Sequence, residues 1–71
     1  MKKKNFNVHL SLLRKEKGLS QQQLATELNL GNQTNISRWE SGKFEPDIAS
    51  LIKLADFFDV SIDYLVGRKD Y

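Results

Sequence analysis

The side chains with the most evident chemistry lie between residues 33 and 38, where amide, hydroxyl and guanidinium groups occur together. At helical spacing, Ile36 and Trp39 face one side of a helix and the polar groups face the other. Amide and guanidinium groups can form paired hydrogen bonds with base edges in the DNA major groove, and a threonine methyl can contact thymine. We therefore predict base contacts from Gln33, Thr34, Ser37 and Arg38.

Several of these assignments have a plainer alternative. Gln33 can be an exposed amide that only water solvates, although the outward direction of this helix face favours a base contact. Arg38 can bind guanine or a phosphate oxygen, and the residue type does not choose between them. Thr34 is suited to a thymine methyl or to a phosphate.

Other positions beside this polar face are suited to phosphate. Gln21 lies in the first turn of an expected helix, where backbone N–H groups and the helix dipole attract anions. Asn32 is expected to cap the helix that carries the polar face, close to the phosphates. Asn35 can bond a phosphate or only support its helix. Gln22 and Gln23 are expected to be ordinary solvent-facing residues.

The elements that must position these groups are two short helices joined by a turn. Ser20 can cap the first helix, in which Leu24 and Leu28 recur at the spacing of a buried face. Residues 29–32, Asn-Leu-Gly-Asn, interrupt the pattern because glycine and asparagine tolerate positive φ. The second helix follows and ends at Gly42.

Three further helices are expected, and no segment is typical of a strand. Apolar residues recur at helical spacing both before and after the central pair of helices. The expected limits are residues 5 or 7 to 17, residues 48–58 with Asp47 as cap, and residues 62–66 with Ser61 as cap.

Four segments of the chain resemble the Cro/cI-type helix-turn-helix DNA-binding family, also called the xenobiotic-response-element or lambda-repressor-like family. They are FNVHLSLLRKEKG, SQQQLA, ISRWESGKFEPD and LIKLADFFDVSIDYLVG. Together they cover about residues 6–67, nearly the whole chain. The resemblance implies an all-α, compact five-helix domain in which the second and third helices form the helix-turn-helix.

The spacing from Leu24 to Ile36 is one residue longer than is usual in that family. We place the extra residue in the turn, at or near Gly31, which makes Asn32 the cap of the third helix. If the extra residue lies within the start of the helix instead, Gln33 and Thr34 shift by one position and Arg38 does not.

The resemblance also implies roles for residues outside the polar face. Lys43, assisted by Ser41, is expected to contact phosphate after the third helix. Arg14 and Glu40 are expected to form a partly buried ion pair that leaves Arg14 near phosphate. Gln21 is expected to bond the DNA backbone and support the third helix.

Composition and charge fit one small nucleic-acid-binding domain. The chain has 71 residues, no cysteine and a net charge of +2. Residues 1–43 hold eight basic and three acidic residues, a balance of +5, whereas residues 44–71 hold three and six, a balance of −3. We expect one face to meet phosphate and the opposite face to avoid it. Residues 1–5 are expected to be a flexible basic arm and 68–71 a loose tail.

No catalytic or cofactor-binding constellation can be assembled from the sequence. His9 has no cysteine or suitably spaced carboxylate beside it, so we expect no metal site. No glycine-rich phosphate loop or nucleophile triad is present, and we predict neither an enzyme nor a cofactor. No signal peptide or membrane span is evident, so a cytoplasmic protein without membrane contact is expected.

The residues favour a sequence-specific, double-stranded-DNA-binding transcriptional regulator. We expect a repressor that binds an inverted-repeat operator as a homodimer, with the third helix in the major groove. The alternative is a protein-interaction module of the same fold, in an antitoxin-like or anti-repressor-type arrangement with a protein partner. Exposed apolar area is expected at Val8 and Leu12, extended by Tyr64, Val66 and Tyr71.

Overall fold

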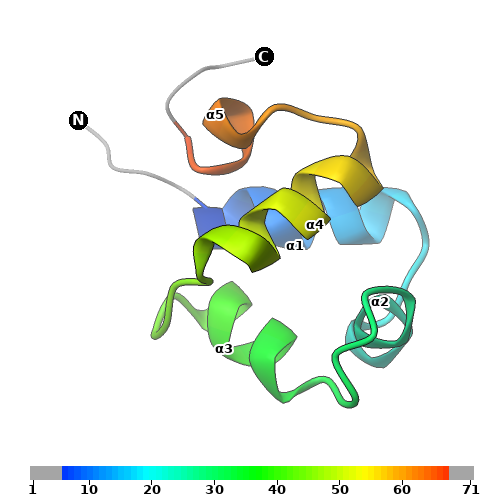
Figure 1. Cartoon of the computed structure of the whole chain (residues 1–71). Helices are drawn as coiled ribbons and strands as arrows, with labels where there is room; N and C mark the ends of the chain where they lie inside the picture. The colour runs from blue at the N-terminus through cyan, green and yellow to red at the C-terminus, as the bar shows by residue number, and fades with distance from the viewer. Residues whose placement is uncertain (1–5, 68–71) are drawn as a thin grey trace.

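A computed structural model describes residues 6–67 and shows five helices in that range, without a strand. They are α1 (Phe6–Glu16), α2 (Gln21–Glu27), α3 (Thr34–Ser41), α4 (Ile48–Phe58) and α5 (Ile62–Leu65) (Figure 1). The prediction of a five-helix, all-α fold is therefore confirmed. The basic arm predicted for residues 1–5 and the tail predicted for 68–71 lie outside the described residues.

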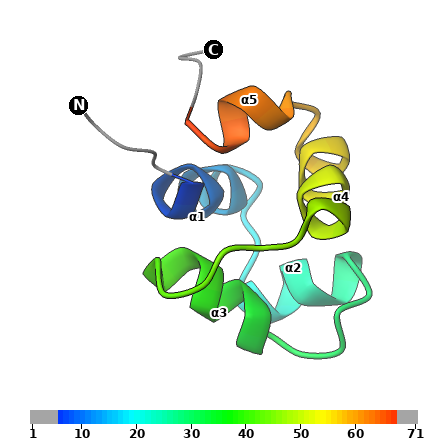
Figure 2. The same ribbon diagram turned by 60° about the vertical axis from the view of Figure 1, so that its left-hand side comes forward.

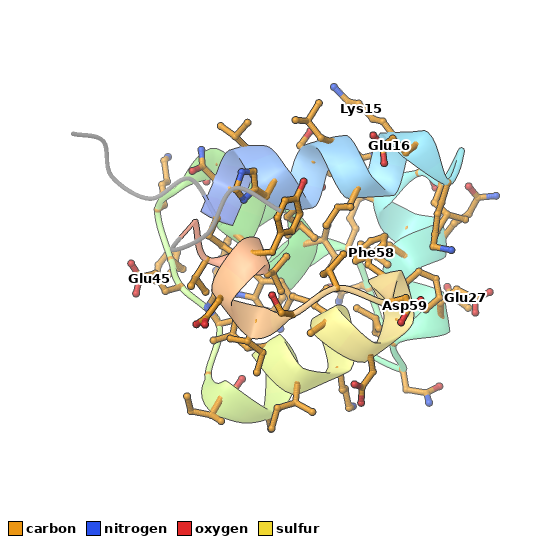
Figure 3. All side chains as sticks on the ribbon, turned by 90° about the horizontal axis from the view of Figure 1, so that it is seen from above. Lys15, Glu16, Glu27, Glu45, Phe58 and Asp59 are labelled. Carbon is orange, nitrogen blue, oxygen red and sulfur yellow. The ribbon has the colours of Figure 1, made fainter. Side chains whose placement is uncertain are left out.

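Each helix contributes one large aliphatic side chain with no exposed surface to a single core. These side chains are Leu10, Leu24, Ile36, Leu54 and Leu65. Within the core, α1 packs against α3 and α5, α2 against α3, and α4 against α5. Phe58, at the end of α4, lies between α4 and α1 (Figure 3). The apolar stripes of the sequence thus converge on one core, and the polar faces of the helices remain outside.

The helix-turn-helix begins with a capping box. The Ser20 hydroxyl accepts the Gln23 backbone N–H at 3.0 Å, and the Gln23 side-chain oxygen accepts the Ser20 N–H at 2.7 Å. The expected cap at Ser20 is present. Gln23 is exposed, as predicted, but its side chain also takes part in the cap. The reciprocal bonds satisfy two backbone donors that a helix start leaves unpaired.

The turn after α2 lies within residues 29–32, as expected, and two of its residues have positive φ. Asn29, with φ of 59°, is the left-handed residue that ends the helix, and the Leu30 N–H donates to the Ala25 carbonyl at 2.9 Å. Gly31 supplies a second positive φ, of 87°, closer to α3. Leu30 packs on the core between them. Two left-handed residues therefore accommodate the long turn.

The prediction that Asn32 is the N-cap of α3 is wrong by one residue. The cap position belongs to Gln33, whose carbonyl accepts the Ser37 N–H at 2.9 Å. The Asn32 side-chain oxygen instead accepts the Thr34 N–H at 2.9 Å. This bond spans two residues in the manner of an Asx turn and holds Gln33 in the turn, so that α3 begins at Thr34.

The apolar surface differs in part from the prediction. Val8 and Leu12 are exposed, at 47% and 54%. Tyr64 and Val66, expected to extend this surface, are only partly exposed. The Tyr64 ring stacks on His9 with centroids 4.9 Å apart, and Val66 lines a hollow beside Phe6. Tyr71 lies outside the described residues.

Candidate DNA-binding surface

The third helix has two chemically distinct sides. On its inner side Ile36 is fully buried and Trp39 is 5% exposed. On its outer side every residue with a predicted base contact is exposed, namely Gln33, Thr34, Ser37 and Arg38. Asn32, Asn35, Ser41 and Lys43, predicted to contact phosphate, are also exposed. In both Figure 1 and Figure 2, α2 and α3 lie together at one end of the molecule and α5 lies at the other.

A partly buried ion pair joins α3 to the rest of the domain. Arg14 on α1 donates from Nε to one Glu40 oxygen at 2.6 Å and from Nη2 to the other at 3.1 Å. Its Nη1 donates to the Leu19 carbonyl at 2.8 Å. The two side chains are only 11% and 9% exposed. The pair of bonds to Glu40 is the bidentate geometry typical of a guanidinium and a carboxylate, and it joins α1 to α3. The bond to Leu19 adds the loop after α1.

Gln21 adds α2 to the same cluster. Its side-chain nitrogen donates to the Glu40 carboxylate at 3.1 Å. The hydrogen bonds to Glu40 raise the pKa of Arg14 above its ordinary value, with the negative charge of Glu40 acting in the same direction. The cluster of Arg14, Gln21 and Glu40 therefore holds α3 in position relative to α1 and α2.

Arg38 has a different kind of partner. Its guanidinium carbon lies 5.0 Å from the centroid of the Phe44 ring, which is within the range of a cation–π contact. Phe44 follows Gly42, the left-handed residue that ends α3, and its side chain is 53% exposed. The sequence alone does not assign Phe44 to Arg38, and this contact is a finding of the structure. An aromatic residue in the polar segment SGKFEPD, close to a cation, was the available signal.

The end of α3 is less cleanly basic than the charge balance suggested. Ser41 donates its hydroxyl to the Arg38 carbonyl at 2.9 Å and accepts the Lys43 N–H at 3.4 Å. A hollow of about 230 Å³ beside this end is lined by Arg38 and Phe44 and also by Glu45 and Asp47. Two acidic residues of the 44–71 half therefore lie next to the polar face instead of opposite it.

The histidine and the metal-binding residue types within residues 6–67 are the other candidates for a site. His9, the only histidine of the sequence, donates from Nδ1 to the Tyr64 carbonyl at 2.8 Å, so this nitrogen has a structural partner. Residues 6–67 contain no group of three or more side chains suited to a metal ion. Nor does any helix in this part of the chain have the length and apolar character to cross a membrane.

Comparison with known proteins finds relatives that carry a helix-turn-helix. Residues 10–65 match the family model described as Helix-turn-helix. The HTH-type transcriptional activator BcrR of Enterococcus faecalis is 45% identical over 65 residues, which are 92% of this chain and 31% of BcrR. The HTH-type transcriptional regulator ImmR of Bacillus subtilis is 39% identical over 57 residues, 80% of this chain and 44% of ImmR.

A solved structure shares the fold. The crystal structure of a transcriptional regulator from Listeria innocua superposes with a TM-score of 0.82 at 42% identity, covering 92% of this chain and 60% of that one. The chain thus spans under half of the two curated relatives and rather more of the Listeria protein. The relatives are named as transcriptional regulators, in agreement with the prediction against an enzyme. With its motifs, its five helices and these matches together, the chain belongs to the Cro/cI-type helix-turn-helix family.

Proposed function

We propose that this chain is a sequence-specific transcriptional regulator that binds double-stranded DNA through the outer side of α3. The observation that carries the proposal is the division of α3 into a buried apolar side and an exposed side of amide, hydroxyl and guanidinium groups. An α-helix fits the major groove, and these groups match the donors and acceptors of base edges. Gln33, Thr34, Ser37 and Arg38 are the proposed base contacts.

Phosphate contacts would frame this helix on both sides. Lys43 follows the end of α3 with an exposed ammonium group, and Asn32 and Asn35 lie at its start. Gln21 uses one amide hydrogen on Glu40, and the second is the one proposed to reach a phosphate. Arg14 and Ser41 are weaker proposals, because their polar groups already bond Glu40, Leu19 and the Arg38 carbonyl.

We further propose that two copies bind an inverted repeat, since one α3 contacts only a few base pairs. Repression is the proposed outcome, because a regulator that covers an operator needs no surface beyond the one that binds DNA. BcrR is named as an activator, so a reporter gene placed behind the selected site is the measurement that decides the sign of regulation.

Selection of binding sites from a pool of random duplexes tests the proposal most directly. We expect one enriched half-site, present twice in inverted orientation about one helical turn apart. With about 4–5 phosphates contacted by each monomer, log K for the enriched duplex should fall against log salt with a slope of about −7 to −9. Absence of enrichment, combined with no salt-dependent affinity for any duplex, would contradict the proposal.

A protein-interaction role is the second candidate, and the exposed side chains of Val8 and Leu12 favour it. These residues lie one turn apart on α1, where they form an apolar strip outside the core. Replacing both by serine should leave DNA affinity of a monomer unchanged if the strip serves a partner. A loss of partner capture with retained DNA binding would show that the two roles coexist.

A further inference from the structure

The segment after α3 contains an aromatic side chain for which the core provides no place. Phe44 is 53% exposed and does not belong to the buried cluster or to the partly buried residues packed on it. Burial therefore does not account for a phenylalanine at this position. The ring instead contacts the Arg38 guanidinium, whose carbon lies 5.0 Å from the ring centroid.

The backbone on both sides of Phe44 places this residue between the end of α3 and the start of α4. Gly42 ends α3 in the left-handed conformation, with φ of 82°, and turns the chain away from the helix. Pro46 is partly buried, and Asp47 is the cap residue from which α4 begins. Phe44 is thus held between two helix ends, directly beside the guanidinium that ends the exposed face of α3.

An aromatic ring holds a guanidinium in a way that a carboxylate does not. The hollow that contains Arg38 also contains the carboxylates of Glu45 and Asp47, and either could pair with the guanidinium. Such a pair would neutralise the charge and occupy two N–H donors. The Phe44 ring is neutral and contacts the face of the guanidinium, so all five N–H groups at its edge remain available to a ligand.

We propose that Phe44 is a positioning residue for Arg38: it restricts the long side chain and keeps it away from Glu45 and Asp47, with its donors free for a base edge. The inference rests on the proposed function, in which Arg38 contacts DNA. Restricting a flexible side chain before binding reduces the entropy lost on binding. A cation–π contact at an exposed site corresponds to roughly a twofold to fivefold change in an equilibrium constant.

The test compares Phe44→Leu, Phe44→Trp and Arg38→Ala on the full chain, using the duplex enriched from the random pool and a scrambled duplex. Phe44→Leu keeps an apolar group but removes the ring, and should weaken binding to the enriched duplex about twofold to fivefold. Phe44→Trp should retain the affinity, and binding to the scrambled duplex should change little. Ile48→Ala, at a 69% exposed apolar side chain nearby, is the matched control and should change neither.

The double variant separates positioning from a direct contact of Phe44 with DNA. In the Arg38→Ala background, Phe44→Leu should have no further effect. If it weakens binding there as much as in the parent, Phe44 acts independently of Arg38 and the inference is overturned.

A readout without DNA tests the contact itself. In the free protein, the NMR resonance of the Arg38 Nε–H group should shift on Phe44→Leu because the ring current is lost, and its order parameter should fall. No change in either quantity overturns the inference. If instead both change, but Arg38→Ala leaves the preference for the enriched duplex intact, the base contact assigned to Arg38 fails and the contact with Phe44 has no role in DNA selection.

Discussion

Two arginines lie on opposite sides of α3 and differ in the chemistry of their partners. Arg14, on the inner side, is 11% exposed in its side chain and bonds Glu40 twice and the Leu19 carbonyl once. Arg38, on the outer side, is exposed and has the Phe44 ring beside its guanidinium, and within residues 6–67 its side chain forms no hydrogen bond or ion pair. The same side chain thus uses three of its five N–H donors within the protein in one place and keeps them free in the other.

The comparison shows how a small domain can assign one arginine to architecture and another to a ligand. A buried guanidinium with unpaired donors would be strongly destabilising, so Arg14 needs the carboxylate and carbonyl that surround it. An exposed guanidinium pays no such penalty, and an ion pair there adds little stability. The neutral Phe44 ring can therefore orient the Arg38 side chain without neutralising its charge.

The largest effect is expected from breaking the inner pair. Arg14→Ala leaves the partly buried Glu40 carboxylate without its cation, which should lower the free energy of unfolding by about 1.5–3 kcal/mol, the range for hydrogen bonds to charged groups. Urea unfolding followed by circular dichroism measures this loss. The double variant Arg14→Met with Glu40→Leu, which removes both charges, should be clearly more stable than Arg14→Ala alone. Equal stability of the two variants would contradict a structural role of the pair.

The outer arginine should give the opposite pattern. Arg38→Ala should leave the unfolding free energy within about 0.5 kcal/mol of the parent, as for a surface change. Its affinity for the enriched duplex should fall by about 1–3 kcal/mol, the discrimination that a bidentate base contact provides. Gln33→Ala should likewise weaken specific binding more than non-specific binding.

Lys43→Ala is the phosphate-type comparison for Arg38→Ala. It should weaken the enriched and the scrambled duplex about equally and make the salt slope less steep by about 1. Fluorescence anisotropy titrations at several salt concentrations distinguish the two patterns. Equal losses on both duplexes for Arg38→Ala would move that residue to the phosphate class.

Gln21 belongs to both sides of the comparison, and its replacement should have a mixed, smaller effect. Gln21→Ala removes the hydrogen bond to Glu40, which should lower stability by about 1 kcal/mol. If the second amide hydrogen contacts phosphate, affinity for both duplexes should fall in parallel. Thermal unfolding and anisotropy on the same sample measure the two effects. A loss of stability with unchanged DNA affinity would leave Gln21 with a structural role only.

The smallest effect concerns the pH dependence of stability at the start of α4. Hydrogen bonding with the Ser50 side chain is the main reason that the pKa of Asp47 lies below its ordinary value. A lowered carboxyl pKa contributes stability above the pKa of the unfolded chain, and this contribution is lost as the pH falls through the folded-state pKa. Asp47→Asn should therefore flatten the decline of melting temperature in acid. An unchanged acid profile would show that the exposed carboxylate contributes nothing measurable.

The helices and the polar side of α3 were predictable because they depend on local properties. Apolar residues at helical spacing, the hydroxyl cap at Ser20 and the glycine at position 42 are each visible within a few residues of sequence. The turn was less predictable, since Asn29, Gly31 and Asn32 can each adopt or support the required turn geometry. The structure assigns Asn29 to the end of α2 and Asn32 to the start of α3, with Leu30 between them packed on the core.

The sequence by itself determined five amphipathic helices, the direction of the polar side of α3, and the membership of the chain in its family, because residue spacing decides which side chains share a helix face. Only the tertiary structure decided the partners of the two arginines. Residue type gives both the same charge and the same donors, but Arg14 meets Glu40 across 26 positions of sequence, and Phe44 reaches Arg38 only after the chain turns at Gly42. Contacts that depend on how separate elements pack are not recorded in any local pattern.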